Sequence, residues 1–377
     1  MRPKKICFVV SSPLTARAFL SSHLAVMSSD YEIDLVADTD NIAELGDAGK
    51  YARLSPAPIR RKISPWSDFC GLMALTSLFR RERYAAITSV TPKAGLLALL
   101  AGWLTRAPVR IHIFTGQVWA TRRGWKRALL KAVDWLMARL ATHTLTDSPS
   151  QRDFLIAEGV VHADRIQVLG AGSICGVDGK RFRPSAERRA AVRTRHAIPD
   201  DAVVFLYLGR LNCDKGVLDL AEAFAGVDTP SARLLVVGPD EAGLRTEMEM
   251  RIGSNLPHAC FVGFTNKPED YISAADVFCL PSYREGFGTV IIEAAAAGLP
   301  AIASRIYGVT DAVAEGITGV LHAPHDIGAI RAAIVSLAAD RKRCEEMGRA
   351  ARERAETLYS VAAITEAWRN YYAQLLD

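Results

Sequence analysis

The sequence predicts an α/β protein built from two parallel, doubly wound domains in tandem. Three observations indicate this fold class. The chain has 377 residues, half of them are apolar, and short β-rich runs alternate with longer helical segments. The alternation breaks at a polar, proline-containing stretch near residues 183–200 and then starts again. We expect the two domains to face each other across a ligand cleft, because open α/β sheets bind ligands beyond the carboxyl ends of their strands.

The first half of the chain supplies the first sheet. Apolar β-rich runs predict strands at 4–10, 31–38, 85–90, 109–114, 143–148 and 166–172. Segments with helical spacing lie between them, as at 15–29 and 91–105. This pattern produces a parallel sheet with helices on its faces. We therefore place an N-terminal Rossmann-like domain at residues 1–190.

The second half repeats the layout. Strands are predicted at 202–211, 232–240, 259–264, 276–282 and 299–305, with a helix from about residue 215. We place a C-terminal Rossmann-like domain at residues 191–355. The remaining segment, 356–377, has helical spacing, and we expect it to pack back toward the N-terminal domain.

Cysteine usage and hydropathy indicate a cytoplasmic protein. The seven cysteines are scattered, odd in number and contain no CxxC pair, so a reduced compartment fits them better than a disulfide framework. The first apolar run is only about six residues long, too short for a secretion signal. The longest one begins at Ala94 and falls short of the roughly 20 residues that a membrane-spanning helix needs. We expect the chain to lie in the cytoplasm, at most on the surface of a membrane.

Charge is divided unevenly between the two halves. Residues 1–197 hold 30 lysines and arginines against 16 acidic residues, and residues 198–377 hold 16 against 25. A basic half favours an anionic partner, and the segment around Trp119 and Trp125 predicts attachment to an anionic membrane surface. The alternative is an ordinary amphipathic surface helix. No aromatic–basic sheet motif supports a nucleic-acid partner. The segment's basic residues are Arg122, Arg123, Lys126, Arg127 and Lys131, and its apolar ones are Leu129, Leu130, Val133 and Leu136.

Two strand-to-helix turns in the second half carry candidate chemistry. In "LYLGRLNCDKG", Arg210 stands at the end of a strand and Lys215 opens a helix, so two cations and a helix N-terminus meet at one anion site. A surface arginine and lysine near a loop would be the simpler interpretation. In "REGFGTVIIEA", Glu285 precedes a glycine-rich turn and Glu293 lies inside the following apolar helix. A buried carboxylate needs partners, and ligand hydroxyls would supply them, although a capping role is the alternative.

These two turns, with their E-x7-E spacing, and "VGF…KPEDYISAADVFCLPS" resemble the retaining glycosyltransferases of family 4, which have the GT-B fold. The resemblance implies that Glu285 contacts the donor sugar, that Glu293 binds the ribose, and that Arg210 and Lys215 neutralise the leaving diphosphate. By the same resemblance Phe264 borders the nucleobase. Residues that it places in an amide-rich turn over sugar and phosphate are Gly286, Phe287, Gly288 and Thr289.

The acceptor is expected on the first domain, at turns 11–19, 91–95 and 112–127. Lys93 and Gly95 open a helix and form a candidate site for an acceptor phosphate. Many relatives carry glycines in the first of these turns, where this chain has Ser-Ser-Pro at 11–13. Relatives also have a histidine close to the donor sugar at the end of the strand that here contains His112. His112 is therefore a candidate catalytic residue, but Phe114-Thr115 can occupy that place instead, and a core position is the alternative.

Stretches such as "VTPKAGLLALLAG" and "GSICGVDGKRF" resemble the subgroup that extends bacterial lipid-linked saccharides. This resemblance implies a UDP-linked N-acetylhexosamine donor, a polyprenyl-diphosphate saccharide acceptor and a place on the inner face of the cell membrane. No cofactor besides the nucleotide sugar is expected. No metal is expected either, because Asp38-x-Asp40 looks like a turn and no cluster has metal-ligand spacing.

The sequence leaves other functions to consider. A nicotinamide oxidoreductase needs G-x-G-x-x-G after the first strand, and "VVSSPLTARAF" lacks it. A non-catalytic nucleotide-sugar-binding protein remains an alternative, as does a GT-B enzyme with a soluble acceptor.

Overall fold

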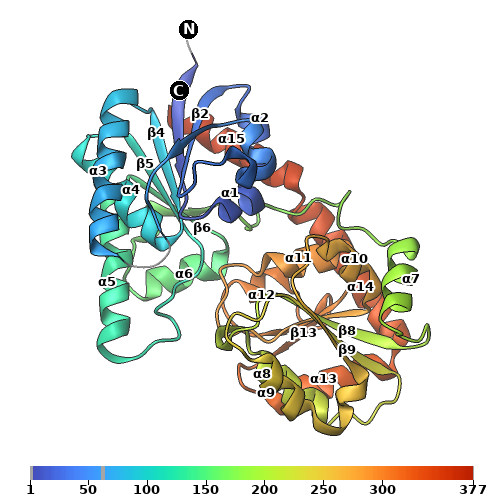
Figure 1. Cartoon of the computed structure of the whole chain (residues 1–377). Coiled ribbons are helices and arrows are strands. Elements are labelled where there is room, and N and C mark those ends of the chain that lie inside the picture. The colour runs from blue at the N-terminus through green and yellow to red at the C-terminus, as the bar shows by residue number, and fades with distance from the viewer. Residues whose placement is uncertain (1–2, 61–63, 377) are drawn as a thin grey trace. The chain divides into compact units, whose positions relative to one another are not determined.

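The computed structural model describes residues 3–60 and 64–376, which form two compact units, shown in Figure 1. Unit 1 comprises Met1–Gly176 and Val361–Asp377, and unit 2 comprises Val177–Ser360. Each unit is built on one parallel sheet, which confirms the predicted fold class. The polar stretch 183–200, where we expected the junction, lies inside unit 2.

Unit 1 holds a seven-stranded sheet in the order β3-β2-β1-β4-β5-β6-β7. The prediction missed β3, because it is short, half-buried and contains a proline, and so lacks a strand pattern. The predicted helix at 15–29 is broken into two at Leu20. The strands are β1 (Lys4–Val9), β2 (Tyr31–Ala37), β3 (Arg53–Pro56), β4 (Ala86–Val90), β5 (Val109–Phe114), β6 (His143–Thr146) and β7 (Ile166–Val168). The helices are α1 (Pro13–Phe19), α2 (Ser21–Met27), η1 (Ile42–Lys50), α3 (Pro65–Glu82), α4 (Pro92–Leu104), α5 (Gly124–Leu140), α6 (Pro149–Ala157), η2 (Ala163–Arg165) and α15 (Val361–Leu376).

Helices cover both faces of this sheet, because successive side chains of a strand point to opposite sides. Phe8 of β1 packs with α1, α2 and α15, whereas Val9 packs with α3 and α4. The C-terminal helix α15 thus completes one core of unit 1. It is fixed there by Thr365, whose hydroxyl lies 2.8 Å from Nδ1 of buried His23, and by a hydrogen bond between Tyr372 and Thr88.

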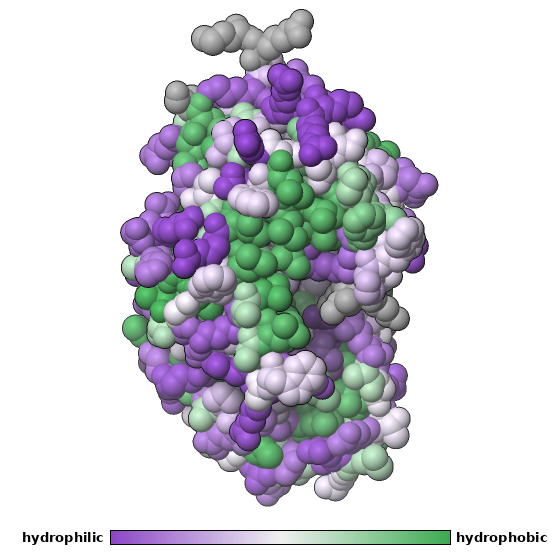
Figure 2. All heavy atoms as spheres, turned by 90° about the vertical axis from the view of Figure 1, so that its left-hand side faces the viewer, coloured by the Kyte–Doolittle hydropathy of each residue, from purple (hydrophilic) through white to green (hydrophobic). Residues whose placement is uncertain are grey.

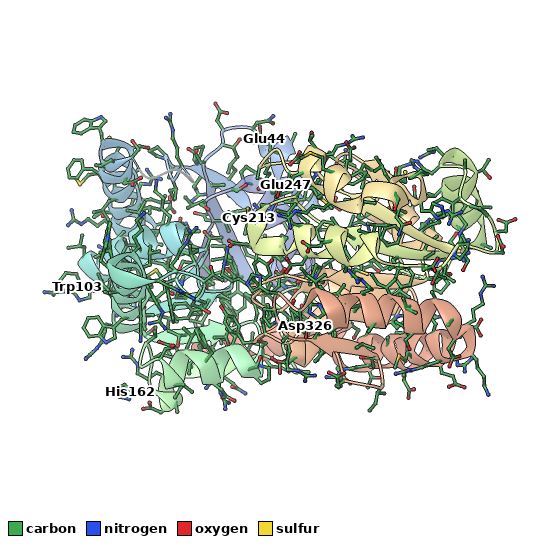
Figure 3. The ribbon with its side chains drawn as sticks, turned by 90° about the horizontal axis from the view of Figure 1, so that it is seen from below. Glu44, Trp103, His162, Cys213, Glu247 and Asp326 are labelled. Atoms are coloured by element: carbon green, nitrogen blue, oxygen red, sulfur yellow. The ribbon has the colours of Figure 1, made fainter. Side chains whose placement is uncertain are left out.

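The outer face of α3, α4 and α5 is apolar. Of the six tryptophans in the sequence, four are exposed, and all four lie on these helices: Trp66, Trp103, Trp125 and Trp135. On this side of the molecule Figure 2 shows a hydrophobic area bordered by hydrophilic residues, and Figure 3 shows Trp103 pointing away from the protein. Trp119 is a correction to the sequence interpretation. It is buried and donates an indole hydrogen bond of 2.7 Å to Asp134, so it cannot face a membrane.

None of the described helices combines the length and the apolar character that crossing a bilayer requires. Asp38 and Asp40 lie in an exposed bend directly after β2, as the sequence indicated.

Unit 2 holds a six-stranded sheet in the order β10-β9-β8-β11-β12-β13. Its last strand was missed because a four-residue run with little periodicity gives no clear signal. The strands are β8 (Val203–Leu208), β9 (Ala232–Val237), β10 (Ala259–Val262), β11 (Val277–Leu280), β12 (Ala301–Ser304) and β13 (Gly319–His322). The helices are α7 (Ala186–Arg195), η3 (Cys213–Lys215), α8 (Val217–Ala225), α9 (Arg245–Ile252), η4 (Gly253–His258), α10 (Pro268–Ala274), α11 (Thr289–Ala296), α12 (Val309–Ala312), α13 (Ile327–Ala339) and α14 (Arg341–Leu358).

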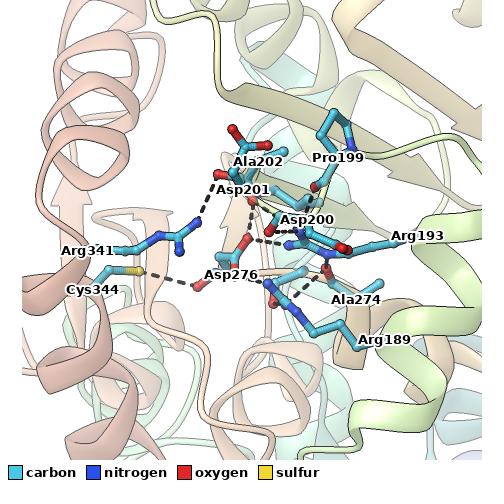
Figure 4. A network of polar contacts seen from close by, with 12 residues as sticks. Arg189, Arg193, Pro199, Asp200, Asp201, Ala202, Ala274, Asp276, Arg341 and Cys344 are labelled. Atoms are coloured by element: carbon cyan, nitrogen blue, oxygen red, sulfur yellow. Dashed lines mark hydrogen bonds and ion pairs between the residues drawn. The ribbon is translucent and has the colours of Figure 1, made fainter.

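Helix α7 explains why residues 183–200 looked like a linker. Its composition is highly charged, but two of its arginines are structural, as Figure 4 shows. Arg189 and Arg193 each place a guanidinium nitrogen against Asp276, at 2.7 Å and 2.8 Å from its two carboxylate oxygens. Arg193 is only 2% exposed and also donates to several backbone carbonyls. An arginine paired and hydrogen-bonded in this way can be buried, which composition alone does not reveal.

Candidate active site

The candidate site lies where the sheet of unit 2 changes direction. From β8 the chain builds outward through β9 and β10, and then returns to place β11 on the other side of β8. The loops that follow β8 and β11 therefore leave neighbouring strands at the same edge. Such a switch point is the general ligand position in open α/β sheets. The predicted residues at 209–216 and 285–289 are all in these two loops or at the start of α11.

The two loops are joined by direct contacts. Asp214 accepts a backbone hydrogen bond of 2.8 Å from Tyr283, and its carboxylate lies 3.1 Å from the guanidinium of Arg284. Gly216 adopts the left-handed conformation (φ +64°), and a Cβ there would lie 2.0 Å from the carbonyl oxygen of Pro281. Only glycine fits this close approach, so the local fold requires it.

Lys215 and Glu285 form an ion pair across the two loops. The Lys215 Nζ lies 2.6 Å from Oε1 of Glu285, and both side chains are largely buried. The sequence pointed to both residues separately, and the fold brings them together. A cation and a carboxylate held at the switch point can each exchange their partner for a ligand that carries phosphate and hydroxyl groups.

The glycine-rich turn leads directly into α11. Gly288 caps this helix with a positive φ of 78°, and the helix begins after the C-terminal end of β11, where its first amides have no acceptor within the helix. Thr289 is the first helical residue. The side chain of Phe287, by contrast, is buried and packs edge-on against Tyr359 with ring centroids 5.1 Å apart. Any contact of Phe287 with a ligand must therefore come from its backbone.

Glu293 is the fifth residue of α11, and its side chain is partly buried. Within the described residues no hydrogen bond or ion pair reaches it. Burial raises the pKa of Glu293 to about 7, against the opposing effect of Arg181 and with a further rise from Glu269. Arg181 does not neutralise Glu293, because its guanidinium is bound 2.9 Å from Glu269. A ligand hydroxyl would satisfy the group that the protein leaves unpaired.

Arg210 and Phe264 lie at more open positions. Arg210 follows β8, is partly exposed, and pairs with Glu241 at 2.9 Å. Phe264 follows β10, and its ring is 68% exposed. The amide of Gly238 donates to Val262 and Gly263, which brings the ends of β9 and β10 together.

Unit 1 has its own switch point, between β1 and β4. The hydroxyl groups of Ser11 and Thr91, one from each strand end, lie 3.0 Å apart. Thr91 has φ +80° and ψ 145°, a region that residues other than glycine rarely enter. Backbone strain of this kind gathers at functional sites. The predicted acceptor turns 11–19 and 91–95 thus meet.

The three other predicted residues of unit 1 are already engaged inside it. Lys93 forms an ion pair of 2.5 Å with Asp68 of α3. Gly95 is buried, and a Cβ there would lie 2.4 Å from the His112 ring. The ring therefore fits because glycine has no side chain at this position. His112 is 1% exposed, hydrogen-bonds Ser89 at 2.9 Å, and burial lowers its pKa to about 3. These contacts support packing roles for Gly95 and His112.

Sequence reasoning missed Asp147, which directly follows β6 at the same edge of unit 1. Its side chain is 6% exposed, and its Oδ1 is buried without a hydrogen-bond partner among the described residues. Burial raises the pKa of Asp147 to about 8. The sequence does contain a signal for Asp147, because an acidic residue follows an apolar strand there, as Glu285 does in unit 2. Unlike Glu285, Asp147 has no glycine-rich turn beside it.

Comparison with known proteins finds a matching family model in each unit. A model of the group 1 glycosyl transferases matches residues 188–354, and a model of the glycosyl transferase 4-like domain matches residues 23–172. The capsular polysaccharide biosynthesis glycosyltransferase CapM of Staphylococcus aureus is 30% identical over 85% of this chain and 84% of its own length.

Two further proteins extend the comparison. The UDP-Gal:alpha-D-GlcNAc-diphosphoundecaprenol alpha-1,3-galactosyltransferase of Escherichia coli is 26% identical over 89% of this chain and 88% of its own length. The crystal structure of Anabaena Alr3699/HepE in complex with UDP and glucose superposes with a TM-score of 0.83. The superposition covers 98% of this chain and 100% of the Anabaena chain. Because the two sequences are only 18% identical, the likeness shows the fold alone.

Proposed function

The chain belongs to the family 4 glycosyltransferases of the GT-B fold, and we propose that it transfers a sugar from a UDP-linked donor to a polyprenyl-diphosphate-linked saccharide with retention of configuration. Transfer of an N-acetylhexosamine is the specific form of this proposal. The observation that carries it is the ion pair of Lys215 and Glu285 at the switch point of unit 2, directly before the helix that holds Glu293.

The donor is assigned to unit 2. We assign its ribose hydroxyls to Glu293, because hydroxyl groups can donate hydrogen bonds to a partly buried carboxylate that has no partner among the described residues. Glu285 receives hydroxyls of the sugar, and Phe264 offers an exposed ring to the base. The UDP complexes of a protein with the same fold, and the UDP-sugar named for the Escherichia coli relative, support a uridine donor.

The chemical step depends on stabilising the leaving diphosphate. Lys215 and Arg210 supply two positive charges, and the first amides of α11 supply further donors. Removing one such donor typically raises the barrier by about 3 kcal/mol. As the anomeric C–O bond breaks, the acceptor hydroxyl forms the new C–O bond on the same face, and the departing phosphate oxygen takes its proton. The cations already present carry the leaving charge, so the reaction is proposed to need no metal ion.

The acceptor is assigned to unit 1, where Ser11 and Thr91 meet at a strained backbone. A lipid-linked acceptor is supported by the relatives, one of which is named for capsule synthesis and one for a diphosphoundecaprenol substrate. We further propose that the protein works in the cytoplasm, peripheral to the inner face of the cell membrane, where such an acceptor is found. A soluble acceptor is the alternative that the experiment must separate.

The test is a panel of UDP- and GDP-sugars, each incubated with a polyprenyl-diphosphate saccharide in detergent or with free saccharide. Product mass identifies the sugar, and the anomeric coupling in the product reports configuration. We expect transfer from one UDP-sugar to the lipid-linked acceptor, with retention. Binding of UDP without hydrolysis or transfer from any donor would instead identify a non-catalytic nucleotide-sugar-binding protein. Transfer only to free saccharide would reject the lipid-linked acceptor, and an inverted product would reject the mechanism.

A further inference from the structure

The outer face of α3, α4 and α5 exposes nine large apolar side chains. Three large side chains on α3 and four on α5 accompany the exposed pair at the end of α4, so the patch runs across all three helices. Indole rings that point into solvent favour the boundary between water and hydrocarbon, where their apolar body and polar N–H are both satisfied. The side chains that define this outer face are Trp66 (76% exposed), Phe69, Met73, Trp103, Leu104, Trp125 (71% exposed), Leu129, Trp135 and Leu136.

Cations border this face. Near the start of α5, Lys126 lies 5.8 Å from the Trp125 ring, and near its end Arg139 lies 4.9 Å from the Trp135 ring. A cation beside an exposed tryptophan combines an anion-binding group with an interfacial anchor. The face is thus apolar at its centre and basic at its rim.

At the C-terminal ends of α3 and α4 the rim contains a pocket. A surface pocket of about 520 Å³ is lined by Arg80, Arg83, Tyr84 and Arg106. A second one, of about 500 Å³, shares Arg106 and is flanked by exposed Trp103. In the described part of the chain no ion pair or side-chain hydrogen bond occupies the guanidinium groups of these three arginines.

The backbone at this pocket is also unusual. Arg83 and Arg106 both adopt the left-handed conformation, with φ of 50° and 55°. Glycine adopts this conformation without strain, whereas a side chain makes it unfavourable. Two of the three unpaired guanidinium groups therefore stand at strained positions on the rim, beside a pocket with room for a phosphate ester.

We propose that the outer face of α3, α4 and α5 inserts into the interface of an anionic lipid bilayer, and that Arg80, Arg83 and Arg106 bind the phosphate of a lipid headgroup. This inference rests on the proposed function, because it names the surface that brings unit 1 to a lipid-linked acceptor. The pocket lies at the end of the unit 1 sheet opposite the strand ends that hold Ser11 and Thr91. The headgroup site is therefore separate from the acceptor site.

An anionic bilayer fits this face better than a protein partner does. Guanidinium groups bind phosphate oxygens through paired hydrogen bonds, and a bilayer offers many phosphates below a continuous apolar layer. Four separate tryptophans spread over three helices match a plane more closely than a groove. A second copy of the chain would bring the same unpaired cations together, which like-charge repulsion opposes.

The experiment is co-sedimentation of the full chain with vesicles. One set contains equal amounts of phosphatidylglycerol and phosphatidylcholine, and the other contains phosphatidylcholine alone. The tryptophan variant combines Trp66→Ser, Trp103→Ser and Trp125→Ser, with exposed Met250→Ser of unit 2 as its control. The arginine variant combines Arg80→Gln, Arg83→Gln and Arg106→Gln. Its control removes three exposed cations of α14, namely Lys342→Gln, Arg343→Gln and Arg349→Gln.

We expect the wild type to bind the anionic vesicles and to be released by salt. Each basic residue near an anionic surface contributes about 1 kcal/mol, which is roughly a fivefold change in partition coefficient. The arginine variant should therefore lose at least tenfold in binding and the tryptophan variant a similar amount, while both controls bind like the wild type. Tryptophan emission should shift to the blue on binding, and brominated lipids should quench it.

Several results would overturn the inference. One is wild-type protein that stays in solution with anionic vesicles at low salt. Another is an arginine variant that is less stable but binds vesicles normally, which would mean that these arginines only stabilise helix ends. Tight binding of free glycerol phosphate without vesicle binding would indicate a soluble phosphate ligand, and a dimer that buries the tryptophans would indicate self-association. Donor turnover with a detergent-solubilised acceptor should remain in both variants, so loss of docking and loss of the proposed activity are distinguishable.

Discussion

Glu293→Gln should make the free protein more stable and its nucleotide complex weaker. Burial raises the pKa of Glu293 from its ordinary 4.5 to about 7. A carboxyl group whose pKa is raised in the folded state holds its proton more tightly there than in the unfolded chain. Stability is therefore lost as pH rises from about 4.5 to about 7, and the loss is complete above that window. Each unit of pKa shift corresponds to about 1.4 kcal/mol, so the cost of the ionised group at pH 8 is about 3 kcal/mol.

The glutamine variant removes this cost because a neutral amide is easier to bury than a carboxylate. We expect its free energy of unfolding to exceed that of the wild type by up to about 3 kcal/mol at pH 8 and by less than about 1 kcal/mol at pH 5. The affinity for UDP should fall by roughly tenfold to a hundredfold, because hydrogen bonds to a charged acceptor are worth about 1.5–3 kcal/mol.

Urea denaturation at pH 5 and pH 8 measures the first effect, and titration calorimetry with UDP measures the second. Glu353→Gln, an exposed position on α14, is the matched control and should change neither quantity. If the pH dependence of unfolding is the same in wild type and Glu293→Gln, folding does not raise the pKa of the Glu293 carboxyl group. A variant with unchanged UDP affinity would remove Glu293 from the donor site.

Three further predictions concern the two units. Lys215→Ala should abolish detectable sugar transfer while circular dichroism shows that the fold is kept; normal turnover would refute the donor-site assignment. Asp147→Asn should raise the free energy of unfolding at pH 8 and leave it nearly unchanged at pH 4. The reason is that a pKa raised to about 8 makes the native carboxyl lose stability as pH rises from about 4 to 8, and equal stabilities at pH 8 would count against this. Gly95→Ala should lower stability by about 1–3 kcal/mol, since its Cβ would meet the His112 ring at 2.4 Å, and a thermal melt that matches wild type would show that the ring can move.

Much of the fold followed from sequence periodicity. The runs at 109–114 and 91–105 correspond to β5 and α4 almost residue for residue, because buried parallel strands and the helices that cover them have strong, different periods. The exceptions have physical reasons. β3 and β13 are short, and α7 was read as a linker because its arginines are buried by pairing with Asp276, which composition does not show.

The sequence also located the donor loops, because glycines, cations and acidic residues at strand ends follow from local chemistry. It did not determine which of these groups meet. The pairing of Lys215 with Glu285 joins residues far apart in the chain, and so does the pairing of Arg181 with Glu269.

The sequence by itself determined the two-sheet architecture, the family and the turns that carry polar groups, since all of these depend on residue type and spacing along the chain. Only the tertiary structure decided which tryptophans are exposed. Trp119 and Trp125 lie in the same segment, yet Trp119 is buried and hydrogen-bonded to Asp134, whereas Trp125 is exposed to solvent. That difference arises from packing between helices, because the residues that a side chain contacts depend on its position in the folded structure and not on its position in the sequence.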